Sequence, residues 1–276
     1  MSSLHLTKLF DVKDKVVVIT GGGRGIGKMM ADGFVQNGSK VYIASRNLEA
    51  CQATADELNA KGPGQCIPLQ ADLATEAACK VLAEEIAKKE SKVDVLINNS
   101  GVGVEGDVEH TPEEAWSKIL SLNVTTPFHL IHYLLPLLDV AATSLDAARI
   151  INVGSIAGFM PQRINTIAYD TSKGAMHHMT RVLAAKLARR PNGGHILVNC
   201  IAPGLVPSEM TEGISYLTGK SFEEMDKQQP LERMGQDSDM AGLSIFLASK
   251  ASGWMTGTVI ACDGGAIGAA ETAIGP

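Results

Sequence analysis

The sequence contains no uninterrupted apolar stretch of the length that a membrane-spanning helix requires. Its first ten residues also lack the long apolar core of a secretory signal. Positive charge is not in excess, because 24 lysines and arginines stand against 30 aspartates and glutamates, a net charge of -6. Neither a nucleic acid nor an anionic membrane is therefore an expected partner, and we expect a cytoplasmic protein.

The sequence has no disulfide pattern and no convincing metal site. Its cysteines are odd in number, widely spaced and mostly set in apolar segments, which is typical of reduced thiols packed as small hydrophobic side chains (Cys51, Cys66, Cys79, Cys200 and Cys262). The histidine pairs His129/His132 and His177/His178 have no cysteine or carboxylate beside them at a ligand spacing. We interpret them as packed or solvated side chains and expect no metal.

The chain also lacks a linker, an internal repeat and a low-complexity tract, so residues 1–276 are predicted to form a single domain. Short β-branched runs alternate with segments of helical periodicity. Strands are expected at 15–20, 40–44, 65–70, 93–98, 148–153, 195–201 and 258–262, and helices at 28–38, 48–59, 76–89, 112–138 (as one or two), 168–190 and 238–249. This order predicts an α/β fold with a Rossmann-type, doubly wound, parallel seven-stranded sheet and helices on both faces. Residues 203–237 show no clear periodicity, and we expect a substrate-binding loop there.

A glycine-rich segment, Gly21 to Gly27, separates the first strand from the first helix. Backbone N–H groups and the helix dipole make such a turn a site for a phosphate group. Its spacing, G-x-x-x-G-x-G, differs from the common dinucleotide fingerprint. Taken alone, a glycine cluster is more commonly a flexible loop.

Tyr169 and Lys173 lie four residues apart, which places both side chains on one face of a helix. A fixed positive charge favours the ionised phenol and lowers its pKa, so the pair is able to transfer a proton near neutral pH. In isolation, this spacing is more typical of a surface tyrosine and a solvated lysine.

From Lys15 to Gly265, the chain carries a series of motifs whose order resembles that of the short-chain dehydrogenase/reductase family. Thr20–Gly27 is similar to the family's cofactor turn, and Asn98–Gly101 to its N-N-A-G motif, with Ser100 in place of alanine. Further matches are Asp72-Leu73, Pro203-Gly204 and the segment 256–265 with its D-G-G ending.

The resemblance implies a catalytic tetrad of Asn123, Ser155, Tyr169 and Lys173. Tyr169 would be the general acid in reduction, Lys173 would lower its pKa and hold the cofactor ribose, and Ser155 would stabilise the substrate oxygen. Asn123 would hold a water that connects Lys173 to solvent. Ser155 lies fourteen residues before Tyr169, slightly farther than the family pattern leads us to expect, and the connection from 139 to 147 also looks extended.

The cofactor is expected to be NADP(H) rather than NAD(H). An NAD enzyme places a carboxylate at the end of the second strand, whereas this chain has Ser45-Arg46-Asn47 there, and Arg46 and Arg24 suit a 2′-phosphate. The cofactor-binding residues implied by the resemblance are Gly21, Gly23, Arg24, Gly25, Ile26, Gly27, Ser45, Arg46, Asn47, Asp72, Leu73, Asn99, Ser100, Gly101, Tyr169, Lys173, Pro203, Gly204, Val206 and Ser208.

These implications favour an NADPH-dependent enzyme that reduces a ketone to a secondary alcohol, similar to 3-oxoacyl thioester reductases. The alternatives are a sugar or polyol dehydrogenase, a xenobiotic carbonyl reductase or, in another class, a non-catalytic NADP-binding sensor. We also expect a homo-oligomer, a dimer or tetramer. Aliphatic residues of the long helices, such as Ile131, Leu134, Leu135 and Leu183, would contribute to its interfaces or would face the sheet instead.

Overall fold

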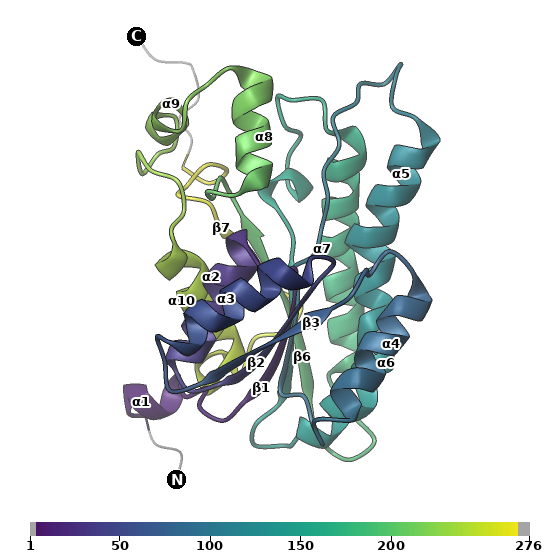
Figure 1. The fold of residues 1–276 in the computed structure, drawn as a ribbon, viewed down its shortest axis with the longest axis vertical. Helices are drawn as coiled ribbons and strands as arrows, with labels where there is room; N and C mark the ends of the chain where they lie inside the picture. The colour runs from purple at the N-terminus through teal and green to yellow at the C-terminus, as the bar shows by residue number, and fades with distance from the viewer. Residues whose placement is uncertain (1–3, 270–276) are drawn as a thin grey trace.

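Seven parallel strands form one sheet in the computed structural model, which describes residues 4–269 (Figure 1). They are β1 (Val16–Thr20), β2 (Lys40–Ser45), β3 (Gln65–Gln70), β4 (Val95–Asn98), β5 (Ala148–Val153), β6 (Ile196–Pro203) and β7 (Val259–Cys262). The order across the sheet is β3-β2-β1-β4-β5-β6-β7, and every neighbouring pair is parallel. The predicted doubly wound fold is confirmed.

Helices cover both faces of the sheet (Figure 1). The main ones are α2 (Gly25–Gln36), α3 (Leu48–Asn59), α4 (Glu76–Ala87), α5 (Glu113–Leu120), α6 (Thr126–Ala141), α7 (Ile167–Leu187) and α10 (Asp237–Ala248). Helices α2, α3 and α10 pack on one face, and α4, α6 and α7 on the other. A short helix, α1 (Leu6–Leu9), precedes the sheet.

Strand β1 shows why the sheet is buried on both sides. Its residues are all buried, and Val16 and Val18 belong to the core under α4, α6 and α7, whereas Val17 and Ile19 belong to the opposite core. Side chains alternate across a strand, so a continuous β-branched run fills two cores at once.

Residues 203–237 are not a continuous loop as expected, because they contain two helices, α8 (Glu209–Thr218) and α9 (Phe222–Lys227). Ser208 caps α8, and Gly219 ends it with a left-handed conformation at φ 68°. Ser221 and Glu224 form a capping box at the start of α9. Both helices are short, so their capping residues are a clearer sequence signal of a helix than the spacing of their apolar residues.

The segment expected as one or two helices from 112 to 138 is α5 followed by α6, joined by a π-helical turn at Ser121–Thr125. Asn123 lies in this turn and is 1% exposed. The π-helical turn thus divides the predicted segment into two helices.

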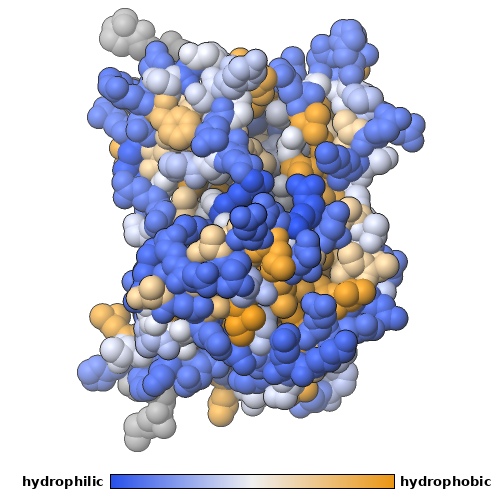
Figure 2. Space-filling model, in the orientation of Figure 1, coloured by the Kyte–Doolittle hydropathy of each residue, from blue (hydrophilic) through white to orange (hydrophobic). Residues whose placement is uncertain are grey.

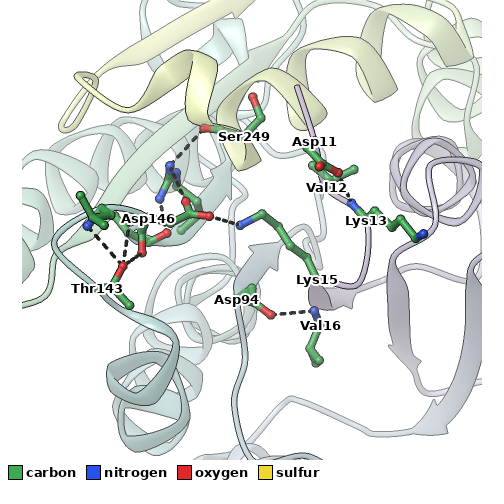
Figure 3. Close-up of polar contacts among 12 residues, drawn as sticks. Asp11, Val12, Lys13, Lys15, Val16, Asp94, Thr143, Asp146 and Ser249 are labelled. Carbon is green, nitrogen blue, oxygen red and sulfur yellow. Dashed lines mark hydrogen bonds and ion pairs between the residues drawn. The ribbon is translucent and has the colours of Figure 1, made fainter. Parts of the chain in front are cut away.

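The connection between α6 and β5 is fixed by Asp146 at the edge of the sheet opposite the glycine turn (Figure 3). Asp146 accepts a hydrogen bond of 3.1 Å from Lys15 Nζ and lies 3.5 Å from Nη2 of the buried Arg149. Nη2 of Arg149 also donates to the Ser249 carbonyl at 3.0 Å. The extended connection is therefore ordered by charge pairing, and it lies far from the opposite, carboxyl edge.

Three of the residues considered for an oligomer interface face the sheet instead. Ile131, Leu134 and Leu183 are 3%, 0% and 9% exposed and belong to the core under α4, α6 and α7, while Leu135 packs partly buried against that core. The sequence left open whether these side chains form an oligomer interface or face the sheet, and in the structure they face the sheet. Among residues 4–269, no helix is both long enough and apolar enough to cross a membrane.

Candidate active site

The carboxyl ends of β1, β4, β5 and β6 bring the predicted site residues to one edge of the sheet. The glycine turn follows β1, Asn99 to Gly101 follow β4, Ser155 follows β5 and Gly204 follows β6. In parallel α/β sheets, this edge is where ligands bind, at the point where the strand order reverses. Here the reversal falls between β1 and β4.

The glycine turn is packed too closely for side chains. A Cβ on Gly27 would lie 2.5 Å from Asn99 Nδ2 and closer still to the Gly21 carbonyl, and Gly21 itself has φ +66°. Helix α2 begins at Gly25 rather than at the expected Lys28, and Arg24 precedes it in an extended conformation without a side-chain cap. The first N–H groups of α2 are thus left for a phosphate, which fits a dinucleotide.

Thr20 locks this turn to the end of β4. Its hydroxyl accepts hydrogen bonds from the backbone N–H groups of Asn99 (3.0 Å) and Ser100 (2.9 Å). The Asn99 side chain donates in return to the carbonyls of Thr20 (2.9 Å) and Gly21 (3.2 Å). The two loops therefore move as one unit, and serine at position 100 replaces alanine without disturbing the backbone contact.

Tyr169 lies near the start of α7, next to Ser155. The Ser155 hydroxyl accepts the Ala157 N–H at 3.1 Å and hydrogen-bonds the Tyr169 phenol. Burial raises the pKa of Tyr169, the hydrogen bond from Ser155 lowers it, and Asp170 raises it further. The net direction of the Tyr169 pKa is upward, because burial outweighs the hydrogen bond from Ser155 that stabilises the phenolate. The lowering of this pKa by Lys173 stays a prediction.

Lys173 is 5% exposed, one turn after Tyr169 on the same face of α7. Its Nζ donates to the Val153 carbonyl at 2.8 Å and lies 5.6 Å from the centre of the Tyr169 ring. Burial lowers the pKa of Lys173 to about 8. A Cβ on Gly101 would lie 3.5 Å from this Nζ, so the ammonium faces the end of β4 as well.

Asn123 reaches the same cluster from the π-helical turn. Its Oδ1 accepts the Val102 N–H at 2.9 Å, and its Nδ2 donates to the Val102 carbonyl at 2.9 Å and to Ser172 Oγ at 3.0 Å. These bonds tie the loop after β4 to α7, which carries Tyr169 and Lys173. In the structure, Asn123 is therefore a connector of backbone segments.

The residues proposed for the ribose end of the cofactor lie at the end of β2. Asn47 caps α3 by accepting the Ala50 N–H at 3.0 Å, and Ser45 Oγ donates to the Asn47 carbonyl at 3.1 Å. Arg46 is exposed, and residues 4–269 offer its guanidinium no ion-pair partner. Asp72 is exposed, while Leu73 is 3% exposed and packs in the core.

Two of the proposed residues connect the site to α8. Ser208 caps that helix, and a Cβ on Gly25 would lie 3.4 Å from the Ser208 side chain. Arg24 forms an ion pair with Glu209, the first residue of α8, which the sequence did not indicate. Val206 is 2% exposed and packs in the core, and Gly204 donates its N–H to the Cys262 carbonyl at 3.0 Å.

His177 lies directly behind the Ser155 turn. It is 3% exposed, its ring centre is 4.6 Å from that of Phe159, and a Cβ on Gly154 would lie 2.5 Å from its Nε2. Burial, together with the nearby charges of Arg181 and Lys173, lowers the pKa of His177 to about 4. The imidazole of His177 is therefore neutral and packed, whereas His178 is exposed. Both agree with the interpretation of these histidines as packed or solvated side chains.

Known proteins share this fold and this order of motifs. Residues 15–216 match the short chain dehydrogenase family. The chain belongs to this family. It is therefore an oxidoreductase, as the sequence predicted, and the resemblance of its motifs is confirmed over most of its length.

Among relatives within the family, the rhamnolipids biosynthesis 3-oxoacyl-[acyl-carrier-protein] reductase of Pseudomonas aeruginosa is 41% identical over 256 residues, covering 93% of this chain and 97% of that protein. The short-chain dehydrogenase/reductase PhomF of Diaporthe leptostromiformis is 36% identical, with 95% and 94% covered. The solved Pseudomonas aeruginosa RhlG/NADP active-site complex has a TM-score of 0.86 at 40% identity, and the match covers 94% of this chain and 98% of that one.

Sequence reasoning gave no role in the site to several residues that hold it together here. They are Ser172, His177 and Glu209, together with the backbone of Val102 and Val153. Thr20 was part of the predicted cofactor turn, but its hydrogen bonds to the end of β4 were not expected. Contacts through backbone carbonyls leave no trace in side-chain identity, and the Arg24–Glu209 pair joins segments whose proximity only the fold establishes.

Proposed function

We propose that the protein reduces the ketone of a 3-oxoacyl compound to a secondary alcohol, with NADPH as its cofactor. The observation that carries the proposal is the arrangement in which Ser155 hydrogen-bonds Tyr169 and the buried Lys173 has its Nζ 5.6 Å from the centre of the Tyr169 ring. It lies on the strand end next to a glycine turn that fits a phosphate. The 3-oxoacyl substrate is suggested by the name of the relative that is 41% identical.

NADPH fits the residues present. The N–H groups at the start of α2 would hold the pyrophosphate, and Lys173 would hold the nicotinamide ribose. Arg46, Ser45 and Arg24 would receive the 2′-phosphate, which agrees with the NADP complex of the related RhlG protein. Bound NADPH supplies the hydride that reduces the carbonyl carbon.

Tyr169 is the general acid of the proposed reaction. Since burial raises its pKa, the phenol remains protonated at neutral pH and is ready to donate to the carbonyl oxygen as negative charge develops there. Ser155 donates a hydrogen bond to the same oxygen and stabilises that charge. Asn123 keeps α7 and the loop after β4 in register, so that both groups hold their positions.

A homo-oligomer in the cytoplasm is part of the proposal. Trp254 is fully exposed, and β7 is a half-buried edge strand of the described sheet. Exposed aromatic side chains and unpaired strand edges are both features that subunit contacts cover. All five cysteines are free thiols, which fits a reducing compartment.

The test is a panel of 3-oxoacyl thioesters and esters, sugars and aromatic ketones, assayed with NADPH and with NADH beside a Tyr169→Phe control. We expect NADPH-dependent reduction of 3-oxoacyl compounds, and a loss in kcat of about 10²-fold or more in the variant. Cofactor binding, followed by NADPH fluorescence, should be retained. Undiminished activity of Tyr169→Phe would reject Tyr169 as the acid, and binding without oxidation of NADPH by any ketone would favour a sensor.

A further inference from the structure

Two segments flank the route to Tyr169. Residues 102–116 pass over the start of α7, where a Cβ on Gly103 would lie 3.5 Å from Tyr169 Cδ2 and Gly106 forms a β-bridge with Thr166. Residues 203–229 contain α8 and α9 and begin against the glycine turn. Helices α8 and α5 stand on opposite sides of the carboxyl edge of the sheet (Figure 1).

These flanking segments are strongly acidic. Residues 102–116 contain five acidic side chains and no lysine or arginine, and residues 203–229 contain five acidic side chains and two lysines. The third segment near Tyr169, residues 156–167, adds only Arg163. Together they carry a formal charge of -7 against -6 for the whole chain, so the remainder of the molecule is close to neutral. The negative charge of this protein is concentrated around its site.

Most of this charge is not neutralised by neighbours. Within residues 4–269, six exposed glutamates of these segments have no ion-pair partner; they are Glu105, Glu109, Glu113, Glu114, Glu212 and Glu224. Lys227 pairs with Glu223, whereas Lys220, hydrogen-bonded to the neutral side chain of Gln228, and Arg163 keep their positive charges. A substrate that approaches Tyr169 therefore meets a net negative field.

Apolar side chains stand exposed on the same segments. Val104, Phe159, Met160, Met210 and Leu217 are between 36% and 46% exposed. Figure 2 shows hydrophilic surface on the two walls of the upper half of the molecule and hydrophobic atoms in the hollow between them. The surroundings of the site thus combine apolar contact area with negative charge at the rim.

We infer that the substrate is an uncharged ketone with an apolar chain, and that it arrives without a phosphate-bearing thiol carrier. This inference rests on the proposed function and narrows it. Coenzyme A and the phosphopantetheine arm of an acidic carrier protein both bring phosphate to the rim, where the glutamates without an ion pair outnumber the two cations without one, Lys220 and Arg163. A neutral ester or a short neutral thioester of the same 3-oxoacyl group meets no such repulsion.

The negatively charged cofactor does not contradict this inference. Its proposed phosphate contacts lie on the other side of the switch point, at the start of α2 and at the end of β2. There the helix N-terminus, Arg46 and Arg24 offset the phosphate charge. Residues 102–116 lie on the substrate side, over the start of α7, whereas α8 begins against the glycine turn, where its first residue, Glu209, is paired with Arg24.

The experiment compares one 3-oxoacyl group on two thiols, N-acetylcysteamine, which is neutral, and coenzyme A, which is anionic. Assays use NADPH and contain EDTA, since ligand atoms of Asp107, Glu109 and His110 lie within 4.8 Å of one another and a divalent cation there would mask charge. We expect kcat/KM to favour the neutral thioester by about tenfold or more at low ionic strength. As the salt concentration rises, kcat/KM for the coenzyme A thioester should increase while kcat/KM for the neutral thioester stays the same. The preference for the neutral thioester should therefore become smaller.

The variant Glu105→Lys/Glu109→Lys changes two exposed charges that have no ion-pair partner within residues 4–269. It should raise kcat/KM for the coenzyme A thioester severalfold and leave the neutral thioester unchanged. The matched control, Glu84→Lys/Glu85→Lys on α4, makes the same change in net charge away from the site. It should leave kcat/KM unchanged for both thioesters.

Equal or better use of the coenzyme A thioester at low ionic strength would overturn the inference while leaving the proposed function intact. The same conclusion would follow if the α4 control acted like the rim variant. Failure to reduce any ketone of the panel with NADPH would instead reject the proposed function, and the inference with it.

Discussion

Lys173 Nζ lies 5.6 Å from the centre of the Tyr169 ring and donates a 2.8 Å hydrogen bond to the Val153 carbonyl at the end of β5. The ammonium is thus anchored by the sheet, and burial lowers its pKa to about 8. Burial raises the pKa of Tyr169, and the one interaction that pulls it down comes from Ser155. The hydrogen bond from Ser155 therefore opposes the upward shift that burial gives the Tyr169 pKa.

Replacing Ser155 with alanine should have two separable effects. Loss of its hydrogen bond to the developing oxyanion should lower kcat by about 10²- to 10³-fold. Loss of its hydrogen bond to Tyr169 should raise the pKa of the phenol, so alcohol oxidation, which needs ionised Tyr169, should require higher pH than in the wild type. Measuring kcat/KM for oxidation against pH tests this. If the pH at which kcat/KM for oxidation rises is the same in the variant and the wild type, Ser155 leaves the Tyr169 pKa unchanged.

Replacing Arg46 with glutamate should reverse the charge offered to a 2′-phosphate. Arg46 is exposed and has no ion-pair partner within residues 4–269, so no salt bridge of the fold is lost with it. The ratio of kcat/KM for NADPH to that for NADH should fall by about tenfold or more, since a charge-assisted hydrogen bond contributes about 1.5–3 kcal/mol. Arg189→Glu, an exposed position near the end of α7, is the matched control. An unchanged ratio would refute the assignment of Arg46.

The sequence predicted the sheet because β-branched strands such as β1 fill two cores and leave a continuous apolar pattern. It predicted the positions of Ser155, Tyr169 and Lys173 through motifs of fixed spacing. It did not predict helices α8 and α9, whose short lengths give weak periodicity, nor the direction of the Tyr169 pKa. That direction depends on how deeply the phenol is buried, and burial of one side chain is set by loops such as 102–111 that lie distant in sequence.

His177 should make the folded protein sensitive to mild acid. Its pKa is about 4 in the folded state against 6.5 as the ordinary value, so below pH 6.5 the unfolded chain binds a proton that the folded chain does not. Stability is therefore retained above 6.5 and lost as pH falls towards 4, by up to about 3 kcal/mol from this group. Urea unfolding at several pH values measures the loss.

The variant His177→Gln keeps a polar, non-titrating side chain at this position. It should be less stable than the wild type at pH 7, yet lose less stability between pH 6.5 and 4. His178→Gln, at the exposed neighbouring position, should match the wild type throughout. If His177→Gln and the wild type lose stability in parallel over this range, the buried imidazole is not the source of the acid sensitivity.

Replacing Gly154 with alanine should displace the Ser155 turn. The added Cβ would lie 2.5 Å from His177 Nε2 and 2.8 Å from Cys200 Sγ, and both side chains are buried and unable to yield. Overpacking of this kind costs about 1–3 kcal/mol, and the shift of Ser155 should lower kcat for ketone reduction while NADPH binding is retained. Gly213→Ala is the matched control, because nothing lies within 4 Å of its Cβ and it sits inside helix α8, where alanine is favoured by about 0.5–1 kcal/mol. Thermal unfolding and steady-state kinetics on both variants decide the matter, and wild-type kcat in Gly154→Ala would mean that the Ser155 turn does not depend on the packing of His177 and Cys200 behind it.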